Sequence, residues 1–194
     1  PPEVTNRGWY RGNLWHHVDQ SYTRNEFECI QSWVTGLDVE EGDATLSFLE
    51  SSNNYHKQFA EHFKISNKAD WYKLNDVEQE FYKDCKHVKI TCPKGSLVLW
   101  DSRTVHCGVE PSRTRMNSKF RAIIYLCYQR RQLCTKSAIE KRIKNFVELR
   151  TTTHYPCKPR VFPIHPHTYG GIIPNIKQIT KPLLNKIGFK LVGY

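Results

Sequence analysis

The chain has 194 residues, and its 29 Lys and Arg outnumber its 19 Asp and Glu, giving a formal net charge of +10. With 39% hydrophobic and 25% charged residues, the composition is that of an ordinary globular protein, which excludes collagen, coiled coil and wholesale disorder. No run approaches the roughly 18 consecutive apolar residues of a membrane-spanning helix, so no membrane span is expected.

The cysteines favour a reducing environment. There are seven, an odd number with no C-x-x-C pair, which suits free thiols better than a disulfide framework or a structural zinc site. The N-terminus also lacks the basic-then-apolar pattern of a signal peptide. We therefore expect an intracellular protein, in the cytoplasm or the nucleus.

The first half of the chain changes from strand to helix patterns. Residues 28–35 and 44–49 read as two strands separated by a turn-rich segment. From residue 53 to residue 84 the pattern becomes helical, with Asn75 or Asp76 placed as an N-cap before Val77. Helices are therefore expected between the second strand and the next group of strands.

Strand patterns return at residues 87–91, 96–100 and 121–128, and several short strands separated by turn signals predict a sandwich or barrel. A basic amphipathic helix follows, for which Ser137 and Glu140 form the expected capping box. Six of the ten prolines fall in the last 44 residues, which predicts an extended arm. We expect one domain over residues 1–150, with the arm of residues 151–194 packed on it.

Three residues have the types and spacing of a metal site. In His17-Val18-Asp19 the two potential ligands are at i and i+2, so both project to the same side of an extended segment. His106 follows at the end of an apolar strand, and Arg121 comes 15 residues later. Two imidazoles and one carboxylate on one face of an iron ion form the facial triad of non-haem Fe(II) oxygenases. The adjacent His16 breaks the i, i+2 pattern and is expected outside the ligand set.

Around these residues the sequence resembles the phytanoyl-CoA dioxygenase-like family of Fe(II)/2-oxoglutarate oxygenases, over roughly residues 15–128. The similarity lies in the H-x-D motif, in the strand, acidic turn and strand of residues 29–46, in the segment from Gly95 to His106, and in Phe120-Arg121-Ala122-Ile123. It implies a mainly β protein with flanking helices around a double-stranded β-helix (jelly-roll, cupin-like) core. It also implies that His17, Asp19 and His106 bind Fe(II) as catalytic and metal-binding residues.

The resemblance extends to the co-substrate. It implies that Arg121 holds the distal carboxylate of 2-oxoglutarate, while Trp33 borders the co-substrate or iron pocket. In related halogenases a small residue replaces the carboxylate ligand, so the retained Asp19 favours hydroxylation. The implied reaction oxidises 2-oxoglutarate to succinate and CO2 with O2 while a second substrate is hydroxylated.

Basic residues suggest the chemistry of that second substrate. Arg113, Arg115 and Lys119 lie between His106 and Arg121, and positive charge at the mouth of the site would attract an anionic small molecule or macromolecule. The alternative is a catalytically silent jelly-roll binding module with a basic nucleic-acid-binding surface. A third interpretation is a metal-dependent cupin-like enzyme that does not use 2-oxoglutarate.

A second group of potential ligands lies near the C-terminus. Its members are His154, Cys157, His165 and His167. Their proline-rich spacing without paired thiols favours a loop over a zinc site.

Overall fold

The computed structural model describes residues 9–116, 119, 121–148, 150 and 152–161. The chain divides into two compact units, Pro1–Tyr128 and Gln129–Tyr194, and each is described by itself. The domain boundaries expected from the sequence, 1–150 and 151–194, remain a prediction.

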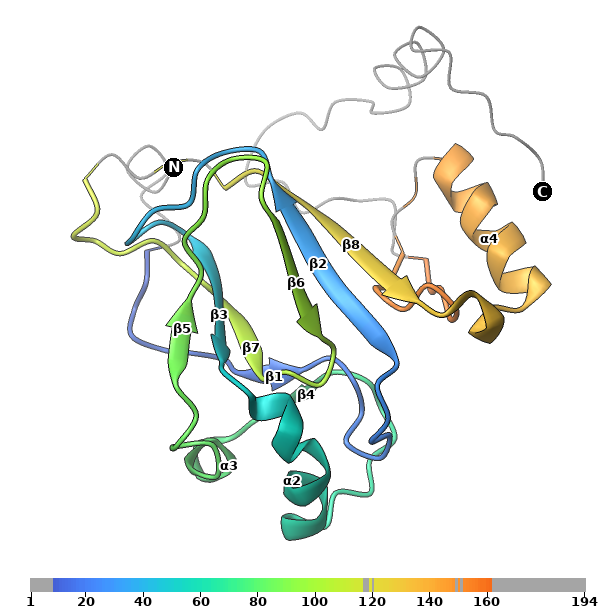
Figure 1. The fold of residues 1–194 in the computed structure, drawn as a ribbon, viewed down its shortest axis with the longest axis horizontal. Helices are drawn as coiled ribbons and strands as arrows, with labels where there is room; N and C mark the ends of the chain where they lie inside the picture. Colours follow the sequence, from blue (N-terminus) through green and yellow to red (C-terminus); the bar gives the residue numbers. More distant parts are fainter. Residues whose placement is uncertain (1–8, 117–118, 120, 149, 151, 162–194) are drawn as a thin grey trace, which may run out of the picture. The chain divides into compact units, whose positions relative to one another are not determined.

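The first unit is built from two antiparallel sheets (Figure 1). The five-stranded sheet has the order β4-β1-β7-β3-β5, and the three-stranded sheet has the order β6-β2-β8. Their bounds are β1 His17–Val18, β2 Cys29–Thr35, β3 Thr45–Leu49, β4 Tyr72–Lys73, β5 His87–Lys89, β6 Leu97–Asp101, β7 His106–Val109 and β8 Ile123–Gln129. The chain crosses repeatedly from one sheet to the other, as in a jelly roll. The expected fold class is therefore confirmed.

One hydrophobic cluster lies on the facing sides of the two sheets. It contains the buried Trp33, Val39, Leu46 and Trp100, with Ile123 packed against it. In the β2–β6 pair Trp33 lies opposite Val98 and Gln31 opposite Trp100, so alternate residues of both strands face this cluster. The inner face of β2 thus carries its odd-numbered residues, Gln31 and Trp33.

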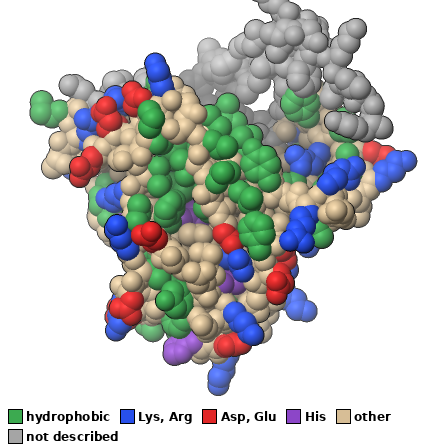
Figure 2. Space-filling view, viewed as in Figure 1, with side chains coloured by type: hydrophobic (Ala, Val, Ile, Leu, Met, Phe, Trp, Pro, Cys, Tyr) green, Lys and Arg blue, Asp and Glu red, His purple; other side chains and the backbone are tan. Residues whose placement is uncertain are grey.

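The outer face of the three-stranded sheet is less covered. Leu97 and Leu99 alternate with the inward residues of β6, and they are 48% and 53% exposed. Figure 2 shows hydrophobic side chains gathered over this sheet.

The segment between β3 and β5 builds a second core on the other side of the five-stranded sheet. It contains η1 (Ser52–Tyr55), α2 (His56–His62), β4 and α3 (Asp76–Glu80). Phe59 of α2 is fully buried with Val18, Tyr22 and Tyr82. The expected cap is confirmed, because the Asn75 side chain accepts from the Glu78 backbone N–H in a capping box. The sequence did not predict β4, whose two residues extend the sheet beyond β1.

In the second unit, η2 (Arg131–Leu133) precedes α4 (Lys136–Val147). The N-cap of α4 is Thr135, whose side chain accepts from the Ala138 backbone N–H, so the expected capping box of Ser137 and Glu140 is wrong. Thr135 already accepts a hydrogen bond from a free backbone N–H at the start of the helix, so the helix begins at Lys136 and Ser137 is its second residue. Beyond the helix, Thr152 and Val161 form an antiparallel bridge.

Over the described ranges, no helix has both the length and the apolar character needed to cross a membrane.

Candidate metal centre

The three predicted ligands lie together between the two sheets. His17 of β1 is paired directly with His106 of β7, so both imidazoles project from the same face of the sheet. Asp19 follows two residues after His17, and its Oδ1 and Oδ2 lie 3.7 Å from His17 Nε2 and 3.2 Å from His106 Nε2. The three residues are buried, and their ligand atoms all lie within 4.8 Å of one another. This geometry allows one ion to contact all three side chains.

Hydrogen bonds to the backbone fix the tautomer of both histidines. His106 Nδ1 lies 2.8 Å from the Thr104 carbonyl oxygen, and His17 Nδ1 lies 3.3 Å from the Trp15 carbonyl oxygen. Since a carbonyl can only accept, each Nδ1 carries the hydrogen and donates it. With the hydrogen on Nδ1, Nε2 is the ring nitrogen that faces Asp19, and its lone pair is the one that a metal would use.

Gln31 orients the carboxylate. Its Nε2 donates to Asp19 Oδ2 at 2.6 Å, and both side chains are buried. Carboxylates that bind a metal are commonly oriented by a hydrogen bond of this kind. Gln31 was not identified from the sequence, although it lies two residues before Trp33 on the inner face of the predicted strand.

His16 immediately precedes β1, and its side chain lies on the other side of the sheet from His17. Its Nδ1 is 3.0 Å from Gln79 Oε1, and its ring meets His87 edge-on. Burial lowers the pKa of His16 below its ordinary value. The expectation that His17 rather than His16 faces the other ligands agrees with this arrangement.

Tryptophan side chains flank His17. Trp15 stacks on its imidazole with ring centroids 4.7 Å apart, and Trp71 lies 5.8 Å away at a tilt. Both tryptophan residues are exposed to solvent, at 42% and 51%. Trp71 has a φ of 66°, a left-handed conformation that costs a residue with a side chain about 1–2 kcal/mol. Its backbone N–H donates to the Asp19 carbonyl oxygen at 3.2 Å, so this conformation holds the indole beside the triad.

Lys73 also belongs to this edge of the centre. It lies directly opposite His17 in the β1–β4 pair, so its exposed side chain projects from the face that carries the triad. Neither Trp71 nor Lys73 was identified from the sequence, because nothing in the local pattern indicates that β4 pairs with β1.

The two predicted co-substrate residues lie on the inner faces but are not brought into the ligand cluster. Trp33 is fully buried, and its Nε1 has no hydrogen-bond partner among the described residues. Arg121 precedes β8 by two residues, and its guanidinium lies 3.5 Å from the Tyr125 hydroxyl. Because Ile123 packs in the inner cluster, the alternation of an extended chain places Arg121 on the same face.

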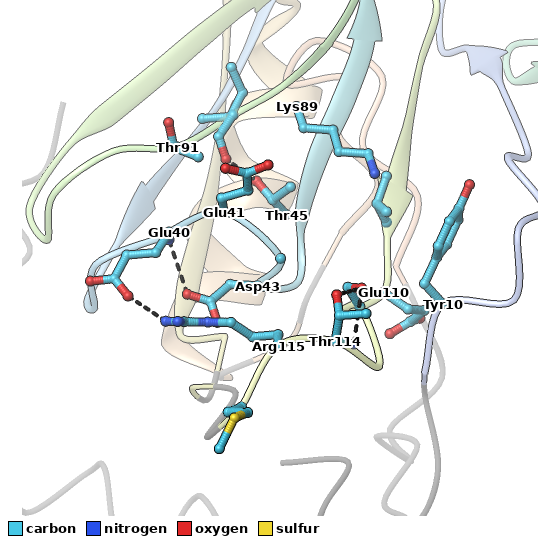
Figure 3. A pocket seen from close by; sticks show the side chains of 15 residues that line it. Tyr10, Glu40, Glu41, Asp43, Thr45, Lys89, Thr91, Glu110, Thr114 and Arg115 are labelled. Atoms are coloured by element: carbon cyan, nitrogen blue, oxygen red, sulfur yellow. Dashed lines mark hydrogen bonds and ion pairs between the residues drawn. The ribbon is translucent and has the colours of Figure 1, made fainter.

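The basic segment after β7 lies against acidic residues. Arg115 Nε is 3.1 Å from Asp43 Oδ1, and Arg115 also pairs with Glu40 (Figure 3). Lys119 Nζ lies 3.0 Å from Glu40 Oε1. Hydrogen bonds from Lys119 and then Arg115 hold the pKa of Glu40 below its ordinary value. Two of the three predicted basic residues are therefore engaged in ion pairs.

These ion pairs border a cavity of about 780 Å³ that is separate from the triad. Its walls include Thr45, Val109 and Arg115. In the β3–β7 pair Thr45 lies opposite Val109, whereas His106 lies at the other end of β7. Figure 3 shows Glu40, Asp43 and Arg115 meeting along this cavity.

Of the C-terminal His/Cys group, His165 and His167 lie outside the described residues. Within the described ranges, His17, Asp19 and His106 are the one group of three or more His, Cys, Asp or Glu side chains close enough to hold an ion.

Comparisons with known proteins agree with this geometry. A 153-residue alignment with Ava biosynthesis cluster protein O from Aspergillus versicolor is 24% identical and covers 73% of this chain. The chain spans about half of that relative, 48% of its length. Residues 4–115 match the family model for phytanoyl-CoA dioxygenase (PhyH), which covers more than half of the chain and all three clustered ligands. The chain belongs to the phytanoyl-CoA dioxygenase family, as its sequence resemblance had indicated.

Proposed function

We propose that this protein is an Fe(II)- and 2-oxoglutarate-dependent dioxygenase that hydroxylates an anionic substrate and converts 2-oxoglutarate to succinate. The observation that carries the proposal is the buried cluster of His17, Asp19 and His106, in which both Nε2 atoms face one carboxylate. Membership of an oxygenase family supports the same chemistry. Two imidazoles and a carboxylate are the ligand set of non-haem iron oxygenases.

The donor set fits Fe(II). When bound, the iron would supply the oxidising chemistry that couples decarboxylation of 2-oxoglutarate by O2 to hydroxylation. The residues around it do the positioning. Thr104 and Trp15 hold the histidines through their carbonyl oxygens, and Gln31 holds Asp19. Because these contacts exist among the residues themselves, the ligands are ordered before an ion binds.

The inner cluster supports a polar co-substrate between the sheets. Trp33 and Trp100 both have a buried Nε1 without a hydrogen-bond partner among the described residues, and the Trp100 ring lies 5.5 Å from that of His106. A buried donor left unpaired is costly, so an acceptor is expected beside it. Carboxylate oxygens of 2-oxoglutarate are suitable acceptors, and the guanidinium of Arg121 would hold the distal carboxylate as a bidentate partner.

The edge formed by Trp71 and Lys73 is the proposed side of approach for the second substrate. Trp15 and Trp71, both exposed, flank His17, and Lys73 adds a cation on the triad face. An anionic group of the substrate would lie near Lys73. The segment containing Arg115 and Lys119 is a weaker candidate for this role, since acidic residues already neutralise those charges.

The test is anaerobic titration of the metal-free protein with Fe(II) and 2-oxoglutarate, followed by measurement of succinate after O2 is admitted. We expect a weak visible charge-transfer band and 2-oxoglutarate turnover in the native protein, and neither in His106→Ala. His16→Gln is the matched control, because the neighbouring histidine lies on the other side of the sheet, and it should retain both signals.

A native protein that binds no divalent metal would refute the proposal and favour the binding-module alternative, which nucleic-acid binding by the metal-free chain would then support. Metal-dependent turnover without 2-oxoglutarate would instead support a cupin-like enzyme of another type.

A further inference from the structure

Two cysteines of the second unit are in direct contact. Cys134 lies between η2 and Thr135, the N-cap of α4, and Cys157 lies in a turn between Thr152 and Val161. Their Sγ atoms are 2.7 Å apart, although 22 residues separate them in the chain. The contact therefore depends on how this part of the chain folds, and no C-x-x-C motif predicts it from the sequence.

Backbone interactions hold the turn in place. The Cys157 N–H donates to Gln129 Oε1 at 3.0 Å, and its Sγ lies 3.8 Å from the Arg130 carbonyl oxygen. The turn itself is closed by the Lys158 N–H, which donates to the Tyr155 carbonyl oxygen at 3.2 Å. Three residues of the segment before α4, Gln129, Arg130 and Cys134, thus contact Cys157 in this turn. Hydrogen bonds of the backbone, and not only the contact between the sulfur atoms, therefore hold the two thiols against each other.

The surroundings of this pair leave both thiols within reach of small molecules. Both thiols are partly buried, so small molecules can reach them, whereas Cys29 and Cys107 are fully enclosed. Burial and then the neighbouring Cys134 raise the pKa of Cys157 to about 11, while Arg142 and Arg131 act in the opposite direction. A thiol reacts as its thiolate, so exchange should be slow at neutral pH and faster in alkaline solution.

We propose that Cys134 and Cys157 form a reversible intramolecular disulfide by exchange with low-molecular-weight disulfides such as oxidised glutathione. One cysteine thiolate attacks a sulfur of oxidised glutathione, forms a mixed disulfide and releases one glutathione thiolate. The second cysteine thiolate then attacks the protein sulfur of that mixed disulfide and releases the second glutathione. The two cysteines lose two electrons and two protons, which appear in two molecules of reduced glutathione. The new bond links the segment before α4 to the turn between Thr152 and Val161.

The test uses the full chain, metal-free and anaerobic, equilibrated in glutathione buffers of increasing oxidised-to-reduced ratio. Remaining thiols are then blocked with iodoacetamide, and non-reduced tryptic peptides are analysed by mass spectrometry. We expect a linked peptide containing Cys134 and Cys157, loss of two alkylated thiols from the seven, and full recovery with dithiothreitol. The linked fraction should form faster at pH 9 than at pH 7.

Variants give a matched comparison. Cys134→Ser should abolish the linked peptide and leave Cys157 either alkylated or joined to glutathione, and Cys92→Ser should leave the link unchanged. Independent alkylation of both cysteines at every ratio would overturn the proposal, and so would a link from Cys157 to any other cysteine.

Discussion

Replacing Gln31 with methionine should weaken metal binding without unfolding the protein. The amide of Gln31 donates a 2.6 Å hydrogen bond to Asp19 Oδ2 in a buried environment. A hydrogen bond to a charged group contributes about 1.5–3 kcal/mol, and loss of such a partner of a metal ligand typically lowers metal affinity about 10- to 100-fold. Methionine has a similar shape and cannot donate. Loss of the amide oxygen breaks no further hydrogen bond, since Gln31 Oε1 has no hydrogen-bond partner among the described residues.

The assay is calorimetric titration of the metal-free variant with Mn(II), a surrogate for Fe(II) that tolerates air. We expect Kd to rise about 10- to 100-fold, equivalent to about 1.4–2.7 kcal/mol. Ser32→Ala is the control, because this neighbour on β2 donates to the Leu126 carbonyl oxygen at 3.0 Å on the other face. It should lose about 1 kcal/mol of stability and retain native metal affinity. Native affinity in Gln31→Met would show that Asp19 needs no such orientation.

Three further predictions concern the co-substrate, the core and the substrate edge. Arg121→Ala should weaken 2-oxoglutarate binding roughly 10- to 150-fold while metal affinity persists, and an unchanged 2-oxoglutarate Kd would assign the carboxylate to another cation. Burial lowers the pKa of His56 from 6.5 to about 4, so this group favours the folded state fully above pH 6.5 and loses that contribution as the pH falls toward 4. The loss amounts to about 3 kcal/mol; urea unfolding should show a shallower pH slope in His56→Phe, and an identical slope would contradict the assignment. Once a substrate is identified, Lys73→Gln should raise its KM and reduce the dependence of KM on salt, while uncoupled 2-oxoglutarate turnover stays constant; salt-independent native kinetics would refute an anionic substrate.

The ligands of the candidate centre could be predicted because their requirements are local. The i, i+2 spacing of His17 and Asp19 is a property of extended backbone, and an apolar strand leads toward His106. The sheet positions the third candidate ligand by pairing His106 with His17. This cross-strand contact is tertiary, but the family resemblance supplied it in advance.

The surroundings of the centre could not be predicted in the same way. Gln31 meets Asp19 because the two sheets pack face to face, and Trp71 and Lys73 reach the centre through a left-handed residue and a strand pair. A hydrophobic pattern encodes none of these. The acidic partners of Arg115 lie 72 and 75 residues away in the chain, so its pairing could not be inferred from the neighbouring sequence. The true N-cap of α4 was missed because Thr135 and Ser137 are equally suitable residue types.

The shortness of β1 links metal supply to the durability of the fold. This strand has two residues, yet it joins β4 to β7 and carries the candidate ligand His17 at its first position. An ion held by His17, Asp19 and His106 would stabilise the pairing of β1 with its neighbours, since it would bind the folded chain and not the unfolded one. At a free metal concentration 100 times the Kd, this adds about 2.7 kcal/mol to the free energy of unfolding. Cells starved of the metal would then hold less of the protein, as well as less active protein, because the open junction exposes the chain to proteases.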